Sequence, residues 1–248
     1  MKRIIVNADD CGKSVSVDEC IEKAIVAGKL SSTTIMANMD DFEGAVRLYK
    51  EYKEQVSFGW HINLDEGETM THSQLLLDKG FFVERNGRSY LNGKGFGKKY
   101  LDRSTRDEIR KELKAQWGKL RDSGIEISHA DSHHFYHTQP SMLLVMPSLF
   151  KELGIKRCRQ VSNYGFSGLS SAARSLWAAY MKARGMIMPE TFCSFNQYYS
   201  NSNNKQGETI ELMCHPGHSD PIYIKEYECL MKTDVSQWGA KLITYREI

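Results

Sequence analysis

Short apolar runs alternate with longer amphipathic stretches along most of the chain. The first run, RIIVNAD at residues 3–9, is rich in β-branched side chains, and from Ser16 apolar residues recur at three- and four-residue spacing until Gly28. An apolar run of this length predicts a buried strand, and the longer spacing predicts a helix that packs on it. Ser16 to Glu19 has the pattern of a capping box, which predicts that the helix begins there.

The same alternation of strand and helix continues to the end of the chain. Further strands are predicted at residues 32–37, 56–64, 125–132, 156–159, 209–215 and 241–245, and further helices at about 42–52, 105–121, 143–153, 170–184 and 224–232. Seven or eight strand–helix repeats favour one α/β domain over residues 1–248, a regular or distorted (β/α) barrel of seven or eight strands. A doubly wound open sheet is the alternative.

Residues Asp65 to Arg103 interrupt this alternation. They contain Asn86-Gly87 and Asn92-Gly93, dipeptides typical of tight turns, and the segment GFFVERNGRSYL at residues 80–91, which predicts a β-hairpin. Glycines at positions 95 and 97 follow. Because long loops in compact domains are often functional, we interpret residues 65–103 as a lid-like insertion over one end of the sheet.

Acids and histidines stand at the carboxyl ends of several predicted strands. They are Asp9, Asp10, His61, His129, Asp131, His133 and His215. The carboxyl ends of parallel strands form one rim, so we expect these side chains to converge there. Each alone has an ordinary explanation, such as a turn acid or a hydrogen-bonded core histidine, but burying the whole set without partners is unfavourable. A shared divalent cation accounts for them together.

The residue types also constrain how such a site is built. Adjacent residues of a strand point to opposite faces, so Asp9 and Asp10 can share one site only where the strand leaves its regular pleat. An aspartate with two histidines leaves positions open for water, as catalytic metal sites do. Such mixed ligands suit zinc, manganese, iron or magnesium. Asp131, between His129 and His133, is suited to orienting a ligand imidazole.

Composition removes several classes of partner. Lys+Arg 33 against Asp+Glu 31 leaves a formal net charge of +2, and the basic residues are scattered, so we expect no nucleic-acid partner. No apolar run is long enough for a membrane span or a secretory signal, which predicts a cytoplasmic protein with no membrane partner. Six dispersed cysteines without a CxxC pair indicate neither a disulfide framework nor a zinc ribbon.

Four motifs in order carry a resemblance to a known family: NADD at residues 7–10, HINL from His61, SHADSHHFYH from residue 128 and MCHPG from residue 213. With them, nearly the whole chain resembles the YdjC-like carbohydrate deacetylases, which include the chitooligosaccharide deacetylases. The resemblance implies a (β/α) barrel, a homodimer, one divalent metal ion described as Mg²⁺, and removal of the acetyl group from N-acetylated sugars. Zn²⁺ and Mn²⁺ are alternative metals.

The resemblance also assigns roles to individual residues. Asp10, His61 and His133 match the metal ligands, Asp9 matches the catalytic base and His215 matches the acid. The chain departs from the family pattern at Cys11 and Phe135, which lie beside the proposed ligands and therefore bear on substrate preference.

Amide hydrolysis needs a nucleophilic water, stabilisation of the oxyanion and a proton for the leaving amine. A metal ion can lower the pKa of a bound water toward about 7. Our hypothesis is that Asp9 takes a proton from that water and His215 protonates the departing sugar amine. Arg159 would orient Asp9 or bind substrate, and the aromatic faces of Trp60 and Tyr136 would pack on the sugar.

Three classes of function fit these observations. N-deacetylation of short chitooligosaccharides is the leading one. A metal-dependent phosphoesterase or another amidohydrolase on the same rim is the second, and His129, His134, His137 and His218 could then supply a second metal. A sugar-binding or metal-storing protein without catalysis is the third, and it predicts that Asp9→Asn leaves function intact.

Overall fold

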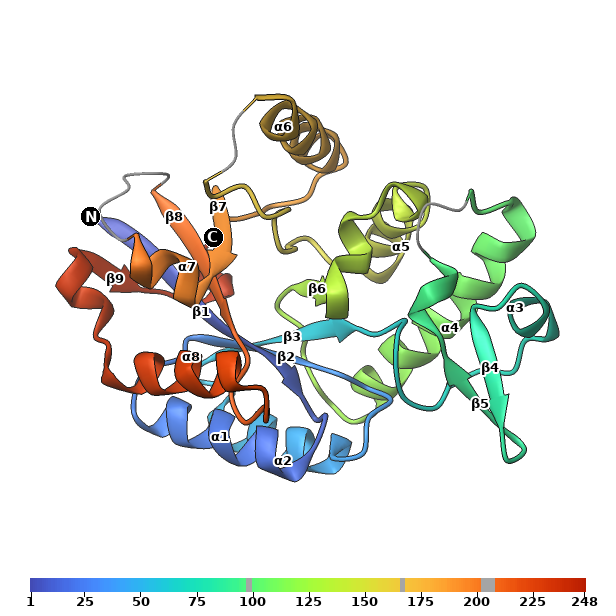
Figure 1. The fold of residues 1–248 in the computed structure, drawn as a ribbon, viewed down its shortest axis with the longest axis horizontal. Coiled ribbons are helices and arrows are strands. Elements are labelled where there is room, and N and C mark those ends of the chain that lie inside the picture. Colours follow the sequence, from blue (N-terminus) through green and yellow to red (C-terminus); the bar gives the residue numbers. More distant parts are fainter. Residues whose placement is uncertain (97–99, 166–167, 202–207) are drawn as a thin grey trace.

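The computed structural model describes residues 1–96, 100–165, 168–201 and 208–248, and one parallel β-sheet organises them (Figure 1). Its strands are β1 (Lys2–Cys11), β2 (Ser32–Ile35), β3 (Ser57–Ile62), β6 (Ala130–Ser132), β7 (Thr191–Ser194), β8 (Thr209–Cys214) and β9 (Ala240–Leu242). The order across the sheet is β6-β3-β2-β1-β8-β7, and β9 pairs with the first residues of β1. All these pairs are parallel, as the alternation of strands and helices predicted.

The sheet curls into part of a barrel, so the barrel prediction is confirmed only in outline. Beyond β6 the chain adds single bridges, Ala130 with Cys158 and Arg157 with Ile187, where the sequence predicted a strand at 156–159. Further along, Asn163 N donates to Phe192 O at 3.3 Å. Within the described residues the sheet is thus half of a barrel whose gap between β6 and β7 is crossed by irregular backbone, and a complete ring of seven or eight strands is not found.

Helices surround the sheet, and all those named below except α7 were predicted from their apolar spacing. They are α1 (Val15–Val26), α2 (Phe42–Tyr52), α4 (Arg103–Asp122), α5 (Met146–Leu153), α6 (Gly168–Ala183), α7 (Phe195–Ser200) and α8 (Pro221–Lys232). Figure 1 shows α1, α2 and α8 beneath the sheet. The predicted capping box was wrong: Ser14 is the N-cap of α1, and its side chain accepts from Val17 N, so Ser16 lies in the first turn.

The insertion forms a separate small element beside α4 (Figure 1). Helix α3 (Gln74–Asp78) precedes the antiparallel strands β4 (Phe82–Arg85) and β5 (Arg88–Leu91), so the hairpin prediction is confirmed. Asn86 and Gly87 form its turn with φ of 51° and 73°, the left-handed conformation that a two-residue turn requires. Phe81 packs edge-on against Phe96, with ring centroids 4.8 Å apart. Gly97 lies outside the described residues.

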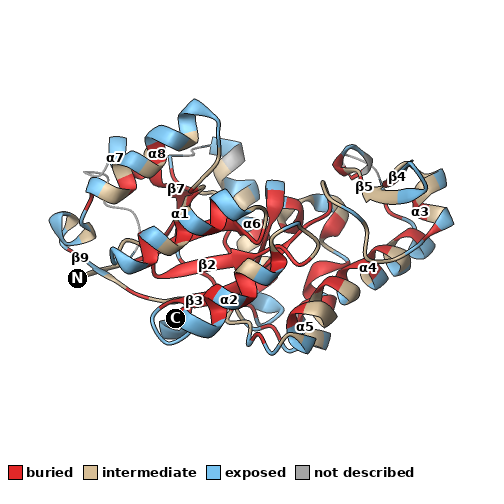
Figure 2. Cartoon of the chain, turned by 90° about the horizontal axis from the view of Figure 1, so that it is seen from below, coloured by how far each residue is buried: buried red, intermediate tan, exposed pale blue. Residues whose placement is uncertain are grey.

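Burial is highest in the sheet (Figure 2). Ile4, Val6, Phe58 and Ile62 have no exposed surface, and they form one core with the inner faces of the surrounding helices. Strand β7 was not predicted, because its sequence TFCS is too short to stand out from its surroundings. None of the helices that the structure describes is sufficiently long and apolar to cross a membrane.

Candidate functional site

The end of β1 breaks its own pleat. The pairing register with β2 shifts between Ala8 and Cys11, and Asp10 has a φ of 67°. A left-handed residue other than glycine costs about 1–2 kcal/mol, and such conformations cluster at functional sites. This break is what the sequence required for both aspartates to serve one site, and both carboxylates do line the same pocket.

Asp10, His61 and His133 form a buried cluster. His61 Nε2 lies 3.0 Å and His133 Nδ1 lies 2.8 Å from Asp10 Oδ1. His61 is the second-last residue of β3, and His133 directly follows β6. After His133 the chain turns sharply, because His134 and Phe135 have φ of 49° and 59°. The three strand ends therefore bring one oxygen and two nitrogen donors within 4.8 Å of one another.

The donor set fits a divalent cation. His61 Nε2 and Asp10 Oδ2 are buried and lack a hydrogen bond of regular geometry, although Asp10 Oδ1 and His218 Nε2, respectively, lie 3.0 Å from them. Burial alone would lower the pKa of His61, but the carboxylates of Asp131, Asp9 and Asp10 raise it to about 10. The surroundings of His61 are therefore strongly acidic and favour positive charge. Two imidazoles and a carboxylate with open positions are typical ligands for Zn²⁺, Mn²⁺ or Mg²⁺ sites.

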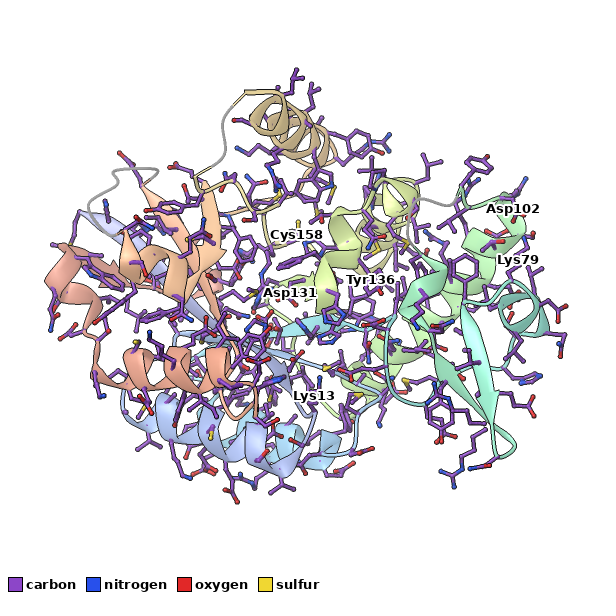
Figure 3. All side chains as sticks on the ribbon, in the orientation of Figure 1. Lys13, Lys79, Asp102, Asp131, Tyr136 and Cys158 are labelled. Atoms are coloured by element: carbon purple, nitrogen blue, oxygen red, sulfur yellow. The ribbon has the colours of Figure 1, made fainter. Side chains whose placement is uncertain are left out.

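Asp131 binds the ring nitrogen of His61 that points away from Asp10. Its Oδ1 lies 2.7 Å from His61 Nδ1, and Thr34 Oγ1 donates to its Oδ2 at 3.2 Å. This pairing fixes the ring so that Nε2 faces Asp10, the arrangement that the sequence predicted for a ligand-orienting carboxylate. In Figure 3 Asp131, Tyr136 and Lys13 lie around this central region, between the sheet and the insertion.

Asp9 is held by a buried arginine. Arg159 donates from both terminal nitrogens to the two oxygens of Asp9, at 2.8 and 2.6 Å, and Asn7 Nδ2 donates to Asp9 Oδ1 at 2.9 Å. Burial raises the pKa of Asp9, but the Arg159 guanidinium outweighs burial and brings it to about 2. Asp9 is therefore a carboxylate of fixed orientation at neutral pH.

Arg159 has no exposed surface and faces two further carboxylates. Its Nη1 lies 2.8 Å from Asp131 Oδ2, and its Nε donates to Glu211 Oε1 at 2.9 Å. The hydroxyl of Tyr245 also donates to Glu211. One guanidinium cannot neutralise three buried carboxylates, and burial raises the pKa of Glu211 to about 7 although Arg159 and Tyr245 act to lower it.

Replacing Glu211 with glutamine is expected to flatten the pH dependence of stability between about pH 4.5 and 7. In this interval folded Glu211 keeps its proton and the unfolded chain loses it, so the free energy of unfolding falls as the pH rises. Glu211 lowers the free energy of unfolding by at most about 3 kcal/mol over this interval. Urea unfolding at a series of pH values measures it. Glu228→Gln, an exposed change on α8, should keep the wild-type slope, and an unchanged slope in Glu211→Gln would contradict the prediction.

His215 and His218 follow β8 and bring two further imidazoles to the aspartates. His215 follows β8, and its Nε2 lies 4.0 Å from Asp9 Oδ2, while its Nδ1 lies 3.5 Å from Glu226 Oε2. Glu226 also accepts from His215 N at 2.8 Å, which fixes the start of this loop. His218 Nε2 lies 3.0 Å from Asp10 Oδ2. Both rings contact Tyr223.

These groups line a pocket of about 230 Å³. Its walls are Asp9, Asp10, Lys13, Glu66, Ser132, His133, His134, Phe135, Met213, His215, His218 and Tyr223. Lys13, Glu66 and Tyr223 were not predicted from the sequence to line the site, and His218 was predicted only as a ligand of a second metal. The second histidine of HPGH, three residues after His215, was the available signal for His218.

Other residues singled out in the sequence lie outside the pocket walls. Trp60 is fully buried and packs on Trp117, with ring centroids 5.8 Å apart. His129 is buried and stacks on Tyr245 at 3.6 Å. Tyr136 is 5% exposed and donates its hydroxyl to Asp65 at 3.1 Å. Trp60 and His129 thus contribute to the packing beneath the site.

His137 and His134 lie in different surroundings. His137 is buried, with Nδ1 2.6 Å from Ser132 Oγ. His134 is exposed and pairs with Asp65, and these two residues with His133 form another group of donors within 4.8 Å.

The chain is similar in sequence to known bacterial proteins over nearly its whole length. The chain is 26% identical over 264 residues to a carbohydrate deacetylase of Clostridium beijerinckii, covering 99% of this chain and 100% of that protein. It is 27% identical over 270 residues to a carbohydrate deacetylase of Geobacillus stearothermophilus, covering 98% and 96%.

A crystal structure from Enterococcus faecalis V583, provisionally named a cellobiose-phosphate cleavage protein, shares the fold. Its TM-score is 0.78 at 21% identity, over 99% of this chain and 98% of that one. The profile of the YdjC-like proteins matches residues 3–241, which include every pocket residue named above. The chain therefore belongs to the YdjC-like protein family.

Proposed function

We propose that the protein is a metal-dependent hydrolase that removes the acetyl group from N-acetylated sugars such as short chitooligosaccharides. The observation that carries this proposal is the convergence of three kinds of group in one pocket. These are the Asp10, His61 and His133 cluster, the Arg159-bound carboxylate of Asp9, and the imidazole of His215. The names of the two bacterial relatives support the choice of reaction.

Asp10, His61 and His133 would hold one divalent ion, with Mg²⁺ proposed from the family and Zn²⁺ or Mn²⁺ as alternatives. When bound, such an ion lowers the pKa of water and polarises an acetyl carbonyl. Asp131 keeps the His61 ring in place for this role. The remaining chemistry belongs to residues that surround the cluster.

Asp9 is the proposed general base and His215 the proposed general acid. Arg159 aims the Asp9 carboxylate but also lowers its basicity, so Asp9 suits a water that is already acidified better than an ordinary one. His215 Nε2, 4.0 Å from Asp9, can donate a proton to the amine that leaves the sugar. Glu226 fixes the His215 backbone and faces its other ring nitrogen.

The pocket walls support a sugar substrate. Phe135 is 37% exposed and, with Tyr223 and Met213, adds apolar surface to the charged walls of the pocket. Aromatic faces of this kind pack on pyranose rings. A pocket of about 230 Å³ has room for an acetamido group.

A substrate panel tests the proposal. Acetate release would be measured from diacetylchitobiose and other N-acetylated mono- and disaccharides, with Mg²⁺, Mn²⁺ or Zn²⁺ supplied separately. p-Nitrophenyl phosphate in the same buffers tests the phosphoesterase alternative. Acetate release without phosphate release supports the deacetylase, and the reverse pattern overturns it. A homodimer and a cytoplasmic location stay predictions, which light scattering and cell fractionation would check.

A further inference from the structure

We propose that Glu66 is a positioning residue for the metal ligand His133. Glu66 lies at the start of the insertion at residues 65–103, so the insertion contributes to the metal centre. This inference rests on the proposed function, because it assumes that His133 binds the ion. It concerns a residue for which the sequence pattern gave no role.

The two ligand histidines have matching surroundings. His61 presents Nε2 to Asp10 and Nδ1 to Asp131, at 3.0 and 2.7 Å. His133 presents Nδ1 to Asp10 at 2.8 Å and Nε2 to Glu66 Oε1 at 3.1 Å. In both rings one nitrogen faces the shared carboxylate and the other faces an outer carboxylate. A carboxylate on the outer nitrogen of a ligand histidine fixes the tautomer and the ring orientation.

The backbone of Glu66 is held firmly in this place. Asn63 Oδ1 accepts from Glu66 N at 3.3 Å, and Asn63 Nδ2 donates to Glu66 O at 2.7 Å. Asn38 Nδ2 donates to the same carbonyl at 3.1 Å, and Gln116 Nε2 in turn donates to Asn63 O at 2.7 Å. Asn63, which directly follows β3, and Gln116 of α4 are fully buried and together anchor the residue that reaches His133.

The side chain of Glu66 is held as well. Lys13, from the loop after Asp10, forms an ion pair with Glu66 and lies 4.0 Å from Asp10 Oδ2. The ammonium group of Lys13 therefore lies between the carboxylates of Glu66 and Asp10 and is closer to Glu66. Because the Glu66 side chain is 36% exposed, its contribution to folding should be small, and its effect should appear in metal binding.

Calorimetric titration of the chelator-stripped, full-length protein with Mn²⁺ tests the inference. In Glu66→Gln the affinity for Mn²⁺ should fall about 10- to 100-fold. The thermal midpoint of the metal-free protein should stay at its wild-type value, which separates positioning from a loss of folding. Glu68→Gln, an exposed change two residues away, is the matched control and should bind Mn²⁺ as the wild type does.

A double variant distinguishes orientation from charge. Without Glu66, Lys13 could turn toward Asp10 and weaken binding by repulsion alone, so Lys13→Gln is combined with Glu66→Gln. Affinity that stays low in the double variant supports the positioning role, and affinity that returns to the wild-type value overturns it. Wild-type affinity in Glu66→Gln alone also overturns it. If the wild-type protein binds none of Mn²⁺, Mg²⁺ and Zn²⁺, the proposed metal centre itself fails.

Discussion

Replacing Asp9 with asparagine is expected to lower the turnover of an N-acetylated sugar by about 10³-fold, the usual range for loss of a general base. Asparagine keeps the shape of the side chain but cannot accept a proton from water. Arg159 retains Asp131 and Glu211 as partners, so the fold should survive. Steady-state acetate release at saturating metal and several substrate concentrations gives kcat and KM separately.

Two further measurements show whether the loss of turnover comes from the missing base. Asp10, His61 and His133 are unchanged in the variant, so the affinity for Mn²⁺ should stay within about tenfold of the wild type. Asp40→Asn, a change at an exposed aspartate, should keep the wild-type rate. Full turnover by Asp9→Asn would remove Asp9 from the mechanism and require a different base.

Replacing Arg159 with methionine is expected to lower the free energy of unfolding by about 3–5 kcal/mol. Methionine fills a similar volume, but it leaves the carboxylates of Asp9, Asp131 and Glu211 buried without their cation. Uncompensated buried charge is far more unfavourable than the loss of a surface ion pair. Urea unfolding followed by tryptophan fluorescence measures the change at neutral pH.

The neighbouring Arg157 offers a matched control. It lies two residues earlier on the same segment, and its Nε donates to Ile248 O at 2.9 Å in a partly exposed position. Arg157→Met should therefore cost no more than about 1 kcal/mol. Arg159→Lys keeps the charge but cannot bind both oxygens of Asp9, so it should fall between the two. Equal stabilities for Arg157→Met and Arg159→Met would show that the buried network does not stabilise the fold.

The sequence predicted the core of the candidate site because strand periodicity locates the carboxyl ends of strands. His61 and His215 could be assigned to one rim from their places after two apolar runs. The adjacent pair Asp9 and Asp10 also implied a break in β1, which appears as the left-handed Asp10. These inferences need only local pattern and the geometry of parallel strands.

Contacts that depend on tertiary packing were beyond the same reasoning. Glu66 reaches His133 because buried amides anchor the start of the insertion, and nothing in the local sequence encodes that partnership. Trp60 was expected near the sugar, but it precedes His61 on β3 and so faces the opposite side, where it packs on Trp117. The irregular segment at residues 156–159 was predicted as a strand from its place in the alternation of strands and helices, yet it makes only single bridges.

Acetate release from diacetylchitobiose, measured before and after chelation and after return of the metal, shows whether the reaction needs a metal ion held by Asp10, His61 and His133. Wild-type protein and His133→Ala would be assayed side by side at matched concentrations. We expect release that stops on chelation, returns with a divalent ion and is absent in His133→Ala. Undiminished release by the metal-free protein or by His133→Ala would contradict a metal centre at Asp10, His61 and His133.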